Sequence, residues 1–85
     1  MTYWRCHLDE PSIERFRGEL DLPEVNNRVE FPGEWDLPES QVREIAKDAF
    51  LVLARQERPD LDRSRIRGLL DELELVCEPA EASQQ

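Results

Sequence analysis

Residues 40–58 read SQVREIAKDAFLVLARQER, and the interpretation of the rest of the chain depends on this stretch. Its apolar residues recur every three or four positions; they are Val42, Ile45, Ala46, Ala49, Phe50 and Leu53. That spacing places them on one face of a helix. The stretch lacks Gly and Pro, and Pro59 follows it directly. It therefore predicts an amphipathic helix that buries this face and ends before Pro59.

The segment before this helix begins with a predicted strand. Thr2–Leu8 carries the β-favouring residues Thr, Tyr and Trp near its start. Alternation along a strand places three of its side chains on the inward face, namely Trp4, Cys6 and Leu8. Pro11 then suits the first turn of a helix. A short apolar stripe predicts that helix, with Gly18 as its end; the stripe is Ile13, Phe16 and Leu20.

Residues 28–37 predict a β-hairpin. Val29 and Phe31 alternate with charged residues, and Trp35 and Leu37 alternate in the same way. Pro32-Gly33 lies between the two runs and is typical of a turn.

The C-terminal third predicts one more helix. Asp62 suits its N-cap, and Leu61 before the cap can pack on Ile66. The apolar stripe continues through Ile66, Leu69, Leu70, Leu73, Val76 and Cys77. Pro79 ends the pattern, and residues 78–85 are expected to form a disordered acidic and polar tail.

Together these elements predict a small single α+β domain over residues 1–77. An N-terminal strand, a short helix and a β-hairpin precede two C-terminal α-helices, which pack on a small antiparallel sheet. A chain of 85 residues that is 39% hydrophobic can build one core.

The chain lacks the residue patterns of an active site. Its one histidine, His7, follows Cys6 on the first strand, where neighbouring side chains point to opposite faces. The three glycines are isolated, and the soft metal ligands Cys6, His7 and Cys77 have no paired spacing. We therefore predict no catalytic residue, cofactor or metal. Cys6 and Cys77 both fall on apolar faces. Two states fit this placement: a disulfide, or the two buried free thiols that are usual in a cytoplasmic protein.

The charge distribution limits the partners. The formal net charge is −9, and the acidic surplus lies in residues 9–39 and 71–81. Such a chain repels phosphate backbones, so direct binding to nucleic acid is not expected. No run is long enough to cross a bilayer, and residues 1–12 do not resemble a signal peptide. We expect a cytoplasmic protein that does not contact membranes.

Two features suggest binding surfaces. Five arginines cluster around Pro59, where they either neutralise helix ends or form a patch for an acidic partner or nucleic acid: Arg55, Arg58, Arg63, Arg65 and Arg67. Leu51 lies opposite the apolar face of helix 40–58, so it either contacts a partner or packs under the N-terminal segment.

Four of these arginines, with Leu51 and Trp35, are the predicted partner-binding residues: Leu51, Trp35, Arg55, Arg58, Arg63 and Arg65. The predicted function is binding of another protein, or of a second copy, as a regulator, inhibitor or adaptor. One alternative is an acidic mimic of nucleic acid that inhibits a nucleic-acid-processing machine, as some inhibitors encoded by mobile elements do. A second alternative is a small regulator that binds nucleic acid through the Arg cluster.

Overall fold

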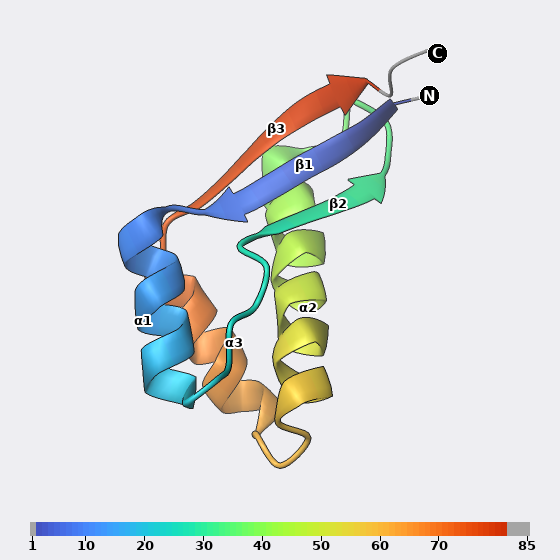
Figure 1. Cartoon of the computed structure of the whole chain (residues 1–85). Helices are drawn as coiled ribbons and strands as arrows, with labels where there is room; N and C mark the ends of the chain where they lie inside the picture. Colours follow the sequence, from blue (N-terminus) through green and yellow to red (C-terminus); the bar gives the residue numbers. More distant parts are fainter. Residues whose placement is uncertain (1, 82–85) are drawn as a thin grey trace.

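The computed structural model describes residues 2–81 and has an α+β fold, as predicted. Its elements are, in order, β1 (Thr2–Leu8), α1 (Glu10–Leu20), β2 (Arg28–Pro32), α2 (Glu39–Glu57), α3 (Arg63–Glu72) and β3 (Leu75–Glu81). The strands form one antiparallel sheet in the order β2-β1-β3. The three helices lie on one side of this sheet, and its other side is open (Figure 1).

β1 is the central strand, and its two faces differ as the alternation predicts. Trp4, Cys6 and Leu8 are buried against the helices. Tyr3, Arg5 and His7 are only partly buried and lie on the open face.

α1 is longer than predicted. Asp9 is its N-cap, and the Asp9 carboxylate accepts a hydrogen bond from the backbone N–H of Ser12 at 3.0 Å. The helix continues past Gly18, and Asp21 ends it in the left-handed conformation, with φ 52°. The prediction of an end at Gly18 was wrong because the extra turn buries Leu20 in the core.

β2 follows the prediction and ends at Pro32, but the turn lies at residues 35–36 instead of Pro32-Gly33, and residues 35–37 do not form a strand. β2 pairs with β1. The Trp4 indole N–H donates to the carbonyl of Glu34 at 2.8 Å and holds the chain in this turn. A Cβ at Gly33 would lie 3.2 Å from the Trp4 ring, so the close approach favours glycine.

The third strand comes from the C-terminal segment, which the sequence assigned to a helix and a tail. α3 ends at Glu72, and Leu75–Glu81 pairs with Thr2–Leu8 along the second edge of β1. An unpaired edge of a central strand is unfavourable, and that long-range pairing prevails over the helical spacing. Residues 78–81 therefore belong to the sheet, and residues 82–85 of the expected tail lie outside the described residues.

α2 is confirmed, but the face that it buries is rotated from the predicted one. Val42, Ala46, Phe50 and Ala54 are fully buried, and Phe50 packs edge-to-face on Phe16 at 6.2 Å between ring centroids. Ile45, which was predicted to lie inside, is 37% exposed.

Leu61 and Ile66 at the start of α3 are both buried, as expected of a hydrophobic staple. The Asp62 carboxylate accepts from the backbone N–H of Arg65, so the predicted N-cap is confirmed as well.

Candidate protein-binding surfaces

Leu51 is a core residue. Its side chain is 8% exposed and packs within the same apolar cluster as Phe50 and Ala54. Of the two roles considered for Leu51, the structure supports packing, because Leu51 belongs to the core cluster that also contains Ile66 and Leu69 of α3. Leu51 is therefore not part of an exposed surface.

Arg58 is held at the end of α1. One guanidinium nitrogen, Nη1, donates to the carbonyl oxygens of Leu20 and Asp21, each at 3.2 Å. The other two nitrogens donate to Asp60 at 3.1 and 3.0 Å. The last carbonyls of a helix lack partners within the helix, and here Arg58 supplies one.

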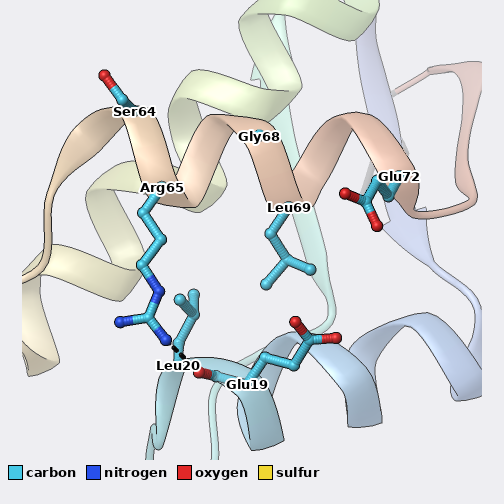
Figure 2. A pocket seen from close by; sticks show the side chains of 7 residues that line it. All are labelled: Glu19, Leu20, Ser64, Arg65, Gly68, Leu69 and Glu72. Atoms are coloured by element: carbon cyan, nitrogen blue, oxygen red, sulfur yellow. Dashed lines mark hydrogen bonds between the residues drawn. The ribbon is translucent and has the colours of Figure 1, made fainter.

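Arg65 reaches the same end of α1 from α3. Figure 2 shows its guanidinium extending toward α1, where it donates to the carbonyl of Glu19 at 2.8 Å. It lies beside a shallow hollow of about 280 Å³ between α1 and α3, which Leu20, Gly68 and Leu69 also line. The Arg65 side chain therefore connects α3 to the end of α1 along one edge of the hollow.

Arg55 and Arg63 are the other two arginines predicted to bind a partner. Arg55 donates to the carbonyl of Pro59 at 3.2 Å and so closes the end of its own helix. Within residues 2–81, Arg63 is exposed and makes neither a side-chain hydrogen bond nor an ion pair. Three of the four predicted arginines thus contact backbone carbonyls of the chain itself.

Several carboxylates around these helices form ion pairs with basic side chains of the same chain. The hydrogen bond from Arg58 holds the pKa of Asp60 below its usual range. Arg67 hydrogen-bonds Glu44 and lowers its pKa, and Lys47 does the same for Asp71. Within residues 2–81, ten of the 20 acidic side chains lie in ion pairs, so much of the acidic surface is neutralised locally.

The turn between β2 and α2 is the best-anchored exposed segment. Thr2 bonds Gly33 twice: its hydroxyl donates to the Gly33 carbonyl at 3.1 Å, and its carbonyl accepts from the Gly33 N–H at 3.5 Å. The Trp4 indole N–H donates to the carbonyl of Glu34, and the Trp35 indole N–H donates to the carbonyl of Ala80 at 3.1 Å. Trp35 is nevertheless 46% exposed.

Trp35 lies next to an uncharged row of the open sheet face. The strand register places Tyr3 between Pro32 on β2 and Ala80 on β3. These four residues, Trp35, Tyr3, Pro32 and Ala80, are called the Trp35 corner below. Below this row, Arg5 lies between Glu30 and Glu78 and forms ion pairs with both.

The Trp35 corner contains one predicted site residue and three that sequence reasoning missed. Tyr3 was correctly placed on the outer face of the first strand. The partners Pro32 and Ala80 depend on the strand register, and Ala80 was assigned to the tail. The alternation of β3 was the available signal, but the helical spacing through Cys77 concealed it.

Cys6 and Cys77 form a disulfide across β1 and β3. They are directly opposite in the register, and Cys6 is fully buried. The interpretation as two free thiols was therefore wrong, and neither sulfur is a free nucleophile. His7 points to the other face of β1, as predicted.

Neither metal-binding nor membrane-spanning features are present in residues 2–81. Their His, Cys, Asp and Glu side chains do not gather in threes that could hold a metal ion. None of the helices in this range is both long and apolar enough to cross a membrane. The chain matches no known protein family, and neither a curated protein nor a solved structure is significantly similar to it.

Proposed function

We propose that this protein acts without catalysis, by binding another protein as a regulator, inhibitor or adaptor through the Trp35 corner. The observation that carries the proposal is the exposed Trp35 ring on a turn fixed by hydrogen bonds to Thr2, Trp4 and Ala80. Tryptophan is enriched among interface residues that dominate affinity. A ring that is already fixed loses little conformational entropy on binding.

The rest of the structure supports a binding role over catalysis. The disulfide removes both thiols, and His7 lies on the opposite face of the strand from Cys6. The described hollows are shallow and lined mainly by charged and amide side chains. The Arg cluster, which the nucleic-acid alternative requires, is largely occupied by the chain's own carbonyls.

The test is capture of partners from an extract of the source cells. Immobilised wild-type protein, Trp35→Ala and Val76→Ala are compared by quantitative mass spectrometry. Val76 is 41% exposed at the other end of the same open face, so its variant is the matched control. We expect a protein that wild type and Val76→Ala retain and that Trp35→Ala loses at least about tenfold.

Two outcomes would contradict the proposal. Equal capture by Trp35→Ala, with an unchanged circular dichroism spectrum, would exclude the Trp35 corner as the contact. A partner released by DNA or by moderate salt, irrespective of Trp35, would favour the acidic mimic of nucleic acid instead.

We place the protein in the cytoplasm as part of the proposal, and the disulfide is the observation against it, because disulfides persist mainly in oxidising compartments. Trapping thiols with a maleimide during cell lysis decides the point. Labelled cysteines would support the cytoplasm, where the pair is kept reduced, and unlabelled cysteines would contradict it.

A further inference from the structure

The outer side of α2 carries a row of uncharged residues, four of them exposed and one, Ala49, partly buried against the core. At 100° per residue, five positions fall within a narrow arc of the helix. They are Gln41, Ile45, Ala49, Val52 and Gln56, called the α2 stripe below. Ile45 is 37% and Val52 52% exposed, although 36% of the whole chain is charged.

The α2 stripe has the spacing of a helix–helix seam. Ile45, Ala49, Val52 and Gln56 are separated by four, three and four positions, which is the a/d spacing of a coiled coil, and Gln41 lies one turn before Ile45. Ala49 lies in the middle, where a small side chain lets two helices approach closely. α2 lies at one side of the helical layer, with α3 and then α1 beside it (Figure 1).

The α2 stripe is also self-complementary when it is reversed. In an antiparallel pair whose twofold axis passes between residues 48 and 49, Gln41 faces Gln56 of the other copy and Ile45 faces Val52. An interface between identical copies related by a twofold axis requires this property, because residue i contacts j and j contacts i.

The charges along one flank complement each other in the same arrangement. Arg55 lies near one end of this flank and Glu44 near the other, so antiparallel pairing brings Arg55 of each copy beside Glu44 of the other. Within one chain Arg55 already donates to the Pro59 carbonyl, and Glu44 already pairs with Arg67 and Lys47, so the contact between copies would extend these networks. Asp48 lies near the axis, where Arg67 of the same chain hydrogen-bonds its carboxylate at 2.7 Å and reduces repulsion between the copies.

We infer that the α2 stripe binds a second copy of this chain, with the two α2 helices antiparallel. The inference does not depend on the Trp35 corner. One helical stripe is small compared with the roughly 800 Å² per partner of a standard interface, so we expect a dissociation constant in the micromolar range or weaker. Salt should strengthen the dimer, because it screens the repulsion between two chains of net charge −9.

Analytical ultracentrifugation across the micromolar range, at low and at high salt, tests the association. The wild-type mass should rise from 10.0 kDa toward about twice that value as the concentration increases. Val52→Glu places two charges in the seam and should weaken association at least about tenfold. Val76→Glu, on the open sheet face, and Trp35→Ala should behave as wild type. Circular dichroism checks that every variant is folded.

Crosslinking tests the orientation. The native cysteines are paired, so an introduced cysteine is the one reactive thiol for a short bis-maleimide. Ala49→Cys should crosslink to its own copy. Gln41→Cys should crosslink when mixed with Gln56→Cys and not alone, because these two ends meet only in an antiparallel pair.

Three results would overturn the inference. Wild type that stays at 10.0 kDa at the highest concentration and salt would exclude the dimer. Association that Val52→Glu leaves unchanged would exclude the α2 stripe. Gln41→Cys that crosslinks efficiently to itself would show a parallel pair. Partner capture through the Trp35 corner would stand in each case.

Discussion

The two ends of the molecule use their side chains in opposite ways. At the connector between α2 and α3, which lies beside the end of α1, arginines are dense but turn inward to backbone carbonyls (Figure 1). At the opposite end, residues 29–42 contain no arginine, and Trp35 stays exposed on anchored backbone. Charge density in a sequence therefore does not identify a binding surface. The useful criterion is whether a side chain already has partners in its own fold.

The largest loss of stability is expected for Leu51, which the sequence predicted as an exposed partner contact and which the structure buries in the core. Leu51→Asp places a carboxylate in the core and should cost about 3–5 kcal/mol, enough to unfold much of a small domain. Val52→Asp is the matched control, since Val52 is the next residue and is 52% exposed, and both variants are measured at a concentration too low for the proposed dimer to form. Urea denaturation of both variants measures the difference. A Leu51→Asp variant that is as stable as Val52→Asp would contradict the burial of Leu51.

The disulfide at the sheet should give the next largest effect. It joins residues that are 71 positions apart, and the chain-entropy argument assigns about 4 kcal/mol to a loop of this length. Denaturation with and without dithiothreitol measures this contribution in one protein. Unchanged stability after reduction would show that β3 remains on β1 without the covalent bond.

A smaller loss of stability is expected at the connector between α2 and α3, where Arg58→Ala and Arg63→Ala should differ. Arg58→Ala leaves the carbonyls of Leu20 and Asp21 without their donor, so the melting temperature should fall by several degrees. Arg63→Ala should leave it unchanged, because Arg63 makes no side-chain bond within the described residues 2–81. Equal effects would contradict the structural role of Arg58.

The smallest effect is expected in the pH dependence of stability. Asp60 has a pKa below its usual value of 3.8 because Arg58 hydrogen-bonds it. The folded state thus favours the ionised carboxylate, and its contribution is complete above the usual pKa and is lost as the pH falls below it. Denaturation between pH 6 and pH 2.5, compared with Asp60→Asn, should show a shallower acid decline for the variant. A steeper acid decline for Asp60→Asn than for wild type would contradict the lowered pKa of Asp60 in the folded state.

The local signals in the sequence predicted most of the fold. Alternation in β1, the N-cap Asp62 and the period of α2 each depend on nearby residues, and all three are present in the structure. β3 could not be predicted in this way, because Leu75–Glu81 adopts a strand only through pairing with β1, more than 60 residues earlier. No Gly or Pro separates α3 from it.

The candidate site was less predictable for a related reason. Leu51 and Ile45 lie on different sides of one helix, and which of them is buried depends on where α3 packs. The roles of Arg58 and Arg65 depend on the position of the end of α1, which the sequence does not place. Trp35 was predicted as a contact on residue type alone, and its anchoring appears only in three dimensions.

The affinity of the captured partner for the wild type and two variants tests the central claim most directly. Titration calorimetry with wild type, Trp35→Ala and Arg63→Ala compares the Trp35 corner with an exposed arginine of the predicted cluster that makes no side-chain bond within residues 2–81. We expect Trp35→Ala to weaken binding by about 30-fold, equivalent to about 2 kcal/mol, and Arg63→Ala to change it little. Strong loss with Arg63→Ala and none with Trp35→Ala would show that the connector end binds the partner.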